Sequence, residues 1–152
     1  MNSLTLRQVS PQENLILIQY VQAYYGYDNL GYNVSVEQAI HELLNDTRLG
    51  GAWFIEIDNQ IGGYVILTAG FDIEFGGKHG VLTDFYLDEG FRDKGYGYQV
   101  LKLIQERAVG YGFRAIELSV TKKNARARHL YERSGFQPLA DRDTMLKSIA
   151  NE

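Results

Sequence analysis

The sequence predicts a mixed α/β fold, in which a central, mostly antiparallel and twisted sheet of about six to seven strands is flanked by about four helices. Three observations predict this fold: two amphipathic segments near the N-terminus, a series of apolar runs of strand length, and a strand, glycine turn and helix in succession. No repeat, linker or low-complexity tract interrupts residues 1–152, and this length is typical of a single domain.

The first third of the chain is expected to form one strand and two helices. Residues 3–9 alternate enough to form a strand. Ser10-Pro11-Gln12-Glu13 has the form of a capping box with proline at the first helical position, so a helix should begin there and extend to about Tyr25. Ser35 opens a second capping box, and the apolar residues behind it recur at helical spacing as far as Asn45.

Further apolar runs predict strands at residues 52–57, 61–68, 80–87, 114–120 and 144–149. The first two are separated only by Asp58-Asn59-Gln60 and are expected to form a hairpin. A helix that runs to about Tyr111 is expected between the strands at residues 80–87 and 114–120. This strand, helix and strand should form a right-handed parallel crossover.

The turn between that strand and helix has the sequence Arg92-Asp93-Lys94-Gly95-Tyr96-Gly97. Glycine lacks a Cβ, so backbone N–H groups can come close to a phosphate, and the helix N-terminus adds a partial positive charge there. The turn therefore indicates a phosphorylated ligand. The alternative is a turn that uses glycine only for its backbone freedom.

A second segment, residues 124–136, predicts a helix that Gly135 ends. Asn124, Ala127, Arg128 and Tyr131 lie on one face of this helix, where they can contact an extended ligand. Basic residues are concentrated in and before the same helix, at Lys122, Lys123, Arg126, Arg128 and Arg133. They could steer an anionic ligand to the site or form a solvated helix face.

The pattern Arg-x-x-Gly-x-Gly, followed by a strand and by Asn-x-x-Ala-x-x-Leu-Tyr-x-x-x-Gly-Phe, resembles the signature segments of GNAT-type N-acetyltransferases over residues 80–136. The resemblance implies a GNAT-like domain that binds acetyl-CoA along a splayed strand and at the phosphate turn. The resemblance, together with the face of the second helix, suggests these cofactor-binding residues: Phe85, Tyr86, Leu87, Arg92, Asp93, Lys94, Gly95, Tyr96, Gly97, Asn124, Arg128 and Tyr131.

Transfer of an acetyl group to an amine needs a base, because a primary amine with a pKa near 10.4 is almost fully protonated at neutral pH. Asp84 is the leading candidate because it lies on the strand expected to carry the thioester, and Glu74 is the second. The backbone N–H near Leu87 could stabilise the developing oxyanion. The resemblance places Tyr131 near the thioester sulfur, where it could protonate the leaving thiolate or position the ligand.

The acceptor site is expected between the first two helices, where Tyr24, Tyr25 and Tyr27 are followed by flexible residues. Residues 71–75 alternate, so Asp72 and Glu74 should project from the same face of a strand. An acidic and aromatic pocket would favour a small cationic amine. Alternatively, the tyrosines pack on the core and the carboxylates are solvated.

Composition excludes several classes of protein. The chain has no cysteine, so a disulfide framework and a cysteine acyl-enzyme are excluded, and acyl transfer would be direct. A net charge of −4 argues against a nucleic-acid partner. No run approaches the length of a membrane span, and His41 has no second histidine at metal-ligand spacing, so we expect a cytoplasmic protein without membrane partner or metal.

The sequence therefore predicts an acetyl-CoA-dependent N-acetyltransferase that acts on a small-molecule amine, as a monomer or a homodimer. Two alternatives stay open. The acceptor could be the amine of a peptide or protein, or the chain could be a non-catalytic acyl-CoA-binding module that regulates a partner.

Overall fold

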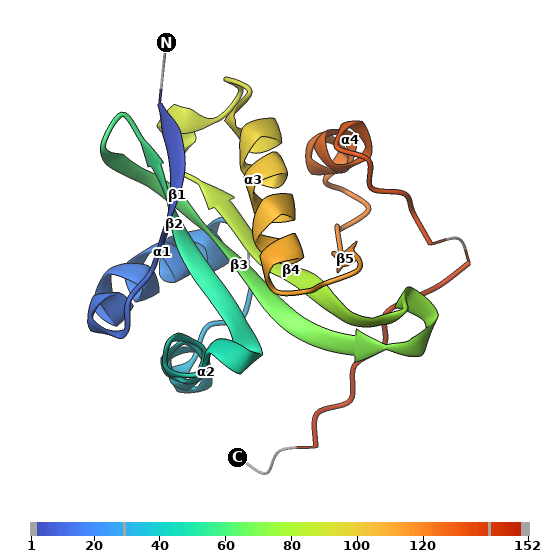
Figure 1. The fold of residues 1–152 in the computed structure, drawn as a ribbon. Helices are drawn as coiled ribbons and strands as arrows, with labels where there is room; N and C mark the ends of the chain where they lie inside the picture. The colour runs from blue at the N-terminus through green and yellow to red at the C-terminus, as the bar shows by residue number, and fades with distance from the viewer. Residues whose placement is uncertain (1–2, 29, 140, 150–152) are drawn as a thin grey trace.

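A sheet of five strands, in the order β1-β2-β3-β4-β5, crosses the part of the chain that the structure describes (Figure 1). The structure is a computed structural model and describes residues 3–28, 30–139 and 141–149. The strands are β1 (Leu4–Gln8), β2 (Gly50–Ile57), β3 (Gln60–Asp72), β4 (Gly77–Leu87) and β5 (Ile116–Glu117). All neighbours pair antiparallel except β4 and β5, which are parallel. The predicted mixed, mostly antiparallel class is confirmed.

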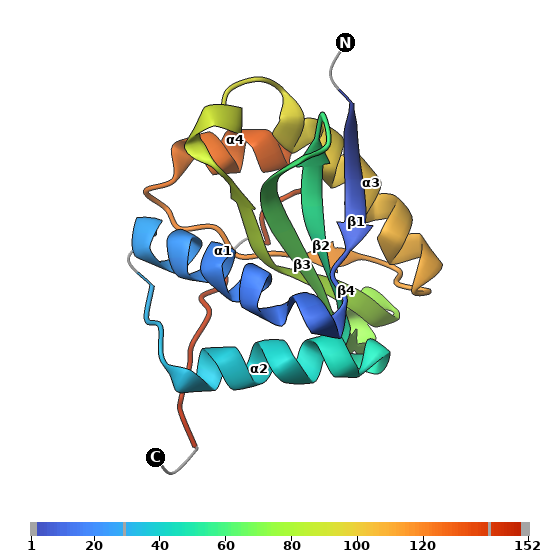
Figure 2. The same ribbon diagram turned by 90° about the vertical axis from the view of Figure 1, so that its left-hand side faces the viewer.

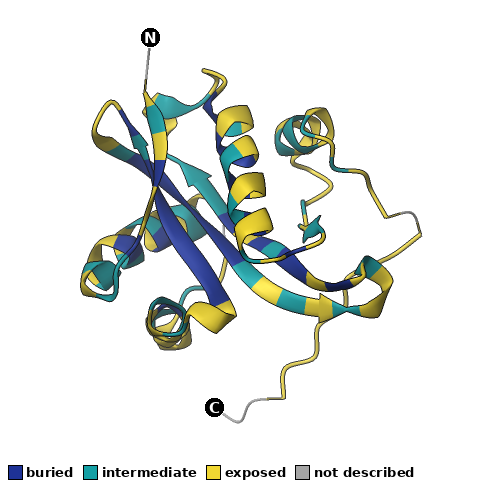
Figure 3. Cartoon of the chain, viewed as in Figure 1, coloured by how far each residue is buried: buried dark blue, intermediate teal, exposed yellow. Residues whose placement is uncertain are grey.

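Four α-helices are found in the described residues, as predicted: α1 (Asn14–Tyr27), α2 (Val34–Asn45), α3 (Tyr96–Gly110) and α4 (Ala125–Arg133). α1 and α2 cover one face of the sheet, and α3 covers the other (Figure 2). Each face has its own apolar core, built around Leu17, Ile40 and Phe54 on the α1 side and around Leu67 and Ile104 on the α3 side. Buried residues are concentrated in β2 and β3 (Figure 3).

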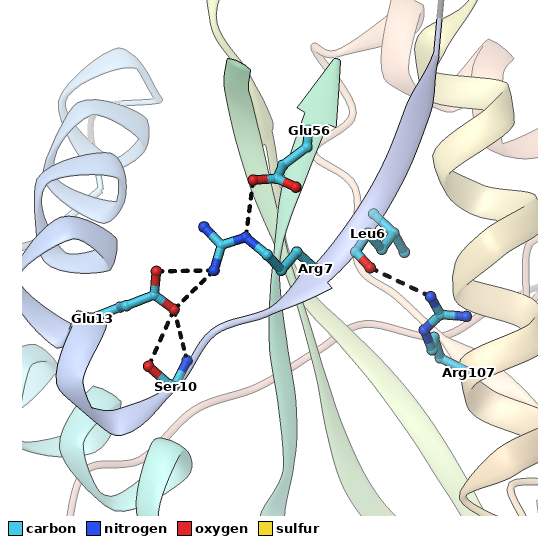
Figure 4. Close-up of polar contacts among 6 residues, drawn as sticks. All are labelled: Leu6, Arg7, Ser10, Glu13, Glu56 and Arg107. Atoms are coloured by element: carbon cyan, nitrogen blue, oxygen red, sulfur yellow. Dashed lines mark hydrogen bonds and ion pairs between the residues drawn. The ribbon is translucent and has the colours of Figure 1, made fainter. Parts of the chain in front are cut away.

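Polar contacts fix the chain between β1 and α1 (Figure 4). Arg7 donates from Nε to Glu56 at 2.9 Å and from Nη1 to Glu13 at 2.9 and 3.0 Å. The Glu13 carboxylate also accepts from the backbone N–H of Ser10 at 3.1 Å, which is the capping contact that the sequence predicts. Arg107 of α3 donates to a backbone carbonyl of β1. The start of the chain is thereby tied to both helical layers.

The predicted count of six to seven strands was wrong for the described residues. Residues 144–149 form no strand, and the strand expected at residues 114–120 is reduced to Ile116–Glu117. The physical reason is backbone pairing: β5 pairs with β4 over only two residues, and residues 144–149 pair with no described strand. An apolar run without a partner does not form a ladder.

Two local predictions also need correction. The cap of α2 is Asn33 rather than Ser35, since the Asn33 side chain accepts from the backbone N–H of Ser35 at 2.8 Å. The alternation at residues 71–75 does not continue as a strand. β3 ends at Asp72, and a short 3-10 turn, Ile73–Phe75, follows, because the Asp72 carboxylate accepts from the N–H of Glu74 at 2.9 Å.

Candidate active site

The two parallel strands diverge and leave one edge of β4 open. β4 and β5 pair only at Gly80 with Ile116 and at Val81 with Glu117, whereas β4 stays paired to β3 as far as Leu87. Beyond Val81, alternate N–H and C=O groups of β4 therefore face the gap without a ladder partner among the described strands. This edge includes Phe85, Tyr86 and Leu87, and an extended amide-containing ligand could pair with it.

The turn before α3 has the geometry of an anion site. Asp93 and Gly95 adopt φ values of 62° and 83°, and Gly95 is the N-cap of α3. The first N–H groups of a helix have no intrahelical acceptor, so they can bind a phosphate. Lys94 is exposed beside the turn, whereas Tyr96 is buried in the core and can offer the turn only its backbone.

The two glycines of the turn serve different purposes. Gly95 needs its left-handed conformation, and open space surrounds it. At Gly97, a Cβ would lie 2.8 Å from a methyl group of Leu130, so this glycine allows α4 to pack closely on α3. The helix that carries Tyr131 is thereby brought next to the turn.

α4 is also joined to the turn by polar contacts. Arg126 forms an ion pair with Asp93. Asn124 caps the helix, with its side-chain oxygen accepting from the N–H of Ala127 at 3.1 Å. Arg128 is exposed and lies 3.8 Å from Glu132, and the exposed side chains of Lys122 and Lys123 precede the helix. A basic surface therefore adjoins the turn before α3.

Tyr131 is half-buried, with its ring 5.8 Å from that of Phe136. Burial raises the pKa of Tyr131 to about 12. A thiol has a pKa near 8.5, so proton transfer from this phenol to a thiolate would be uphill by about 3.5 units, or roughly 5 kcal/mol. The hydroxyl is suited to donating a hydrogen bond rather than a proton.

Asp84 is buried on the face that α1 and α2 cover, with only 7% of its surface exposed. The hydroxyl of Tyr64, itself buried, donates to its carboxylate at 2.7 Å. Burial raises the pKa of Asp84, while hydrogen bonds from Tyr64 and Thr83 oppose that rise. A carboxylate with a raised pKa is a stronger base than an exposed one.

Asp84 lines a cavity of about 540 Å³ between the sheet and the first two helices. Tyr25 contributes from α1, Glu42 and Leu43 from α2, and Ile66 from β3. The cavity thus combines apolar walls with an aromatic ring and two carboxylates. A volume of this size accommodates a small organic molecule.

A cluster of tyrosines adjoins this cavity. The Tyr24 ring lies 5.6 Å from Tyr25, 6.3 Å from Tyr64 and 5.8 Å from Tyr86. Burial raises the pKa of Tyr24 above its usual range, and negative charge on Asp28 and Asp84 adds to that effect. Tyr24 and Tyr25 are therefore packed side chains that border the site.

Arg92 and Tyr27 form a link between the ends of α1 and β4. The Arg92 guanidinium lies 4.2 Å from the centre of the Tyr27 ring and 5.4 Å from that of Tyr86. Its Nε donates to the carbonyl of Leu87 at 2.7 Å. The backbone N–H of Arg92 donates to the carbonyl of Glu89 at 3.2 Å, so in this arrangement Arg92 is engaged in contacts within the protein rather than directed at a phosphate.

The structure does not bring Asp72 and Glu74 to Asp84. Asp72 pairs with Gly77 near the tip of the β3–β4 hairpin, whereas Asp84 pairs with Ile66, which is roughly 20 Å away along β3. The Glu74 carboxylate is exposed and binds Arg142 at 2.9 and 2.6 Å. The candidate residues that do come together are Asp84, Tyr24, Tyr25 and, on the neighbouring helix, Tyr131.

Sequence reasoning missed Tyr64 and Glu42. Tyr64 lies on the same face of β3 as Ile66, so the alternation places it toward α1, but only the strand register reveals that it reaches Asp84. Within the described ranges, no cluster of metal-binding side chains is found. None of the described helices is long and apolar enough to cross a membrane.

Comparison with known proteins agrees with this geometry. Two Bacillus subtilis (strain 168) proteins are similar over a short stretch: the uncharacterised N-acetyltransferase YycN, 43% identical over 56 residues, and a spermine/spermidine N(1)-acetyltransferase, 44% identical over 57 residues. Each match covers 37% of this chain, and 36% and 38% of the respective relative, so it spans little more than a third of their length.

Solved structures share the fold over nearly the whole chain. An integron cassette protein, HFX_CASS3, from the mobile metagenome of Cole Harbour Salt Marsh has a TM-score of 0.81 at 24% identity, covering 97% of this chain and 91% of that one. The aminoglycoside N-acetyltransferase AAC(6')-Iy, solved with CoA, has a TM-score of 0.80 at 14% identity, covering 99% and 97%. The model of the acetyltransferase (GNAT) family matches residues 17–136, and the chain belongs to this family.

Proposed function

We propose that this protein transfers the acetyl group of acetyl-CoA directly to the primary amine of a small cationic molecule. The acetyltransferases of its family use acetyl-CoA, which supplies an activated acetyl thioester. The observation that carries the proposal is the buried Asp84 carboxylate, which accepts from Tyr64 and lines a cavity, on the same strand whose free edge extends beyond Val81.

The residues of this chain fit the cofactor. The open edge of β4 at Phe85, Tyr86 and Leu87, where only the Leu87 carbonyl already accepts from Arg92 among the contacts described above, can pair with the amides of an extended pantetheine arm. The turn at Gly95 and the N-terminus of α3 can bind the pyrophosphate. Lys122, Lys123 and Arg128 can attract the remaining phosphate charge. A ligand that occupied these groups would pass between β4 and α4, next to Tyr131.

The cavity favours an amine that carries positive charge. Glu42 and Asp84 supply negative charge, and the Tyr25 ring supplies an aromatic face on which a cation can lie. Two similar proteins have names that point to such acceptors, a spermine/spermidine and an aminoglycoside acetyltransferase. Polyamines and aminoglycosides are therefore the first molecules to test.

Asp84 would supply the base that the amine requires. A protonated amine with a pKa near 10.4 must lose a proton before it can attack, which costs about 4–5 kcal/mol at neutral pH. Because burial raises the pKa of Asp84, its carboxylate accepts that proton more readily than an exposed aspartate does. Tyr131 would hold the sulfur by a hydrogen bond, since its own raised pKa disfavours proton transfer.

The test is release of the coenzyme A thiol on incubation with acetyl-CoA and a panel of amines: spermidine, an aminoglycoside, a neutral amine and a peptide with a free N-terminus. We expect turnover with a cationic small molecule. Asp84→Asn should lower kcat by at least about 100-fold, as loss of a general base does. Glu42→Gln, the same carboxylate-to-amide change at the mouth of the cavity, should raise KM for the cationic acceptor a few-fold with kcat nearly unchanged.

Turnover only with the peptide would reject the small-molecule acceptor and favour a protein amine. Acetyl-CoA binding without turnover on any amine would favour the non-catalytic binding module. A kcat for Asp84→Asn equal to that of the unchanged protein would remove Asp84 as the base.

A further inference from the structure

The last residue on the free edge of β4 is covered by a side chain of the same molecule. In the register of β3 and β4, Leu87 lies opposite Gly63. The next N–H, that of Asp88, donates to the carbonyl of Gly62 at 2.8 Å. The ladder bonds therefore flank Leu87, and its own N–H and C=O point to the free edge. The Nε of Arg92 donates to this carbonyl at 2.7 Å, which places the guanidinium on the free edge itself.

Two aromatic rings hold the guanidinium of Arg92 in this position. Its central carbon lies 4.2 Å from the centre of the Tyr27 ring and 5.4 Å from that of the Tyr86 ring. A cation is attracted to the face of an aromatic ring, so both contacts are stabilising. Tyr27 is the last residue of α1. The end of α1 is thus joined to the end of β4 through one arginine side chain.

An extended pantetheine arm and Arg92 require the same position. The arm would pair with the outward-facing groups of Phe85 and Leu87, and the guanidinium already lies against the carbonyl of Leu87. An arm that pairs there must displace it. The backbone N–H of Arg92 is bonded to the carbonyl of Glu89 at 3.2 Å, so the displacement is a rotation of the side chain. That rotation breaks the contact with Tyr27 and releases the end of α1.

The turn before α3 offers the released guanidinium a stronger partner. Arg92 is close in sequence to Gly95, the N-cap of α3, where the pyrophosphate is proposed to bind. A bond from arginine to phosphate joins two charged groups, and it is stronger than a bond to a backbone carbonyl. Asp93 is already paired with Arg126 and does not compete for Arg92. Exchange of the carbonyl for the pyrophosphate is therefore favourable.

We propose that Arg92 is the gate of the cofactor site. It closes the free edge of β4 at Leu87, Tyr27 holds it there, and acetyl-CoA displaces it, so that cofactor binding and release of the end of α1 occur together. The inference rests on the proposed position of the pantetheine arm along β4. The apparent dissociation constant of the cofactor then equals the intrinsic constant divided by the fraction of molecules whose gate is open.

The first experiment measures the dissociation constant of coenzyme A by calorimetry on the full chain. Tyr27→Leu should lower it about two- to fivefold, because loss of the cation–ring contact raises the fraction of open molecules. Tyr27→Phe keeps a ring beside the cation and is the control, with an unchanged constant. In an Arg92→Met background, Tyr27→Leu should have no further effect, since the gate is already absent. The Tyr27 side chain is exposed, so folding should be unaffected.

Hydrogen exchange gives a second readout, which depends on neither affinity nor turnover. At the end of α1 the N–H of Asp28 donates to the carbonyl of Tyr24 at 2.9 Å. Coenzyme A should speed exchange of the amides there, because it removes Arg92 from Tyr27. A ligand that only packed on this segment would slow their exchange. In Arg92→Met the same amides should exchange fast with and without coenzyme A.

Three results would overturn the gate: a dissociation constant that Tyr27→Leu leaves unchanged or raises, an effect of Tyr27→Leu that persists with Arg92→Met, and slower exchange at the end of α1 with coenzyme A bound. In each case coenzyme A still binds, and the cofactor site itself stands. Failure of coenzyme A to bind the unchanged protein would reject the site and the gate together.

Discussion

Replacing Tyr64 with phenylalanine removes one buried hydroxyl and keeps the packing of the ring. That hydroxyl donates to the Asp84 carboxylate at 2.7 Å. Burial raises the pKa of Asp84, and this hydrogen bond opposes the rise. A hydrogen bond to a charged group contributes about 1.5–3 kcal/mol, and its loss should raise the pKa of Asp84 further.

The assay is the pH dependence of kcat/KM for the acceptor. If Asp84 accepts the proton of the amine, activity is lost when Asp84 is protonated. The acid limb in Tyr64→Phe should therefore move to higher pH, and at a fixed pH on that limb kcat/KM should fall by about tenfold or more, which corresponds to the loss of about 1.5 kcal/mol or more. Tyr24→Phe is the matched control, because the Tyr24 side chain lies in the same cluster but interacts more strongly with Asp28 than with Asp84. Acid limbs that coincide in all three proteins would refute the assignment of Asp84 as the base.

Stability gives a second measurement on the same variant. The pKa of Asp84 is higher in the folded state than in the unfolded state, so its contribution to stability is fully present below the unfolded pKa and is lost as pH rises through the folded pKa. Tyr64→Phe raises the folded pKa further. The free energy of unfolding should therefore fall little at acid pH and by about 1–3 kcal/mol at neutral pH, which thermal melts at the two pH values would resolve.

Three further predictions concern the cofactor side of the site. Tyr131→Phe should lower kcat about tenfold in steady-state assays, because one hydrogen bond is lost, and should leave the KM for acetyl-CoA unchanged. A loss of kcat above about 1000-fold would instead indicate that Tyr131 donates a proton. Gly95→Ala should weaken acetyl-CoA binding by about tenfold in calorimetry, because a φ of 83° is strained for alanine. Gly90→Ala is the control and should leave binding unchanged, since Gly90 lies in open space and has no positive φ. Lys122→Gln with Lys123→Gln should flatten the salt dependence of acetyl-CoA association in stopped-flow measurements, and an unaltered dependence would leave these lysines as a solvated face.

Local patterns in the sequence were sufficient to predict the turn before α3 and the two helices α3 and α4. The glycine turn, the helix that follows it and the Asn124 segment each depend on neighbours within a few residues, and the structure places them together. The hairpin between β2 and β3 was predictable for the same reason, since Asp58 and Asn59 both adopt the positive φ of a tight turn.

The cavity around Asp84 depends on contacts between residues that are distant in sequence. The distance of Glu74 from Asp84 and from the open edge of β4 is decided by the register of β3 against β4, which has a bulge between Ile66 and Leu67. The partnership of Tyr64 with Asp84 follows from the same register. The number of strands could not be predicted either, because residues 144–149 have the pattern of a strand but pair with no described strand.

A crystal structure of the protein with a coenzyme A–polyamine bisubstrate compound would test the central proposal most directly. We predict that the amine nitrogen lies within hydrogen-bonding distance of Asp84 or of a water bound to it, in the cavity that Tyr25 lines, while the pantetheine arm pairs with β4 at Phe85 to Leu87. An amine seated instead at the hairpin tip near Glu74, or outside the space between α1, α2 and the sheet, would contradict it.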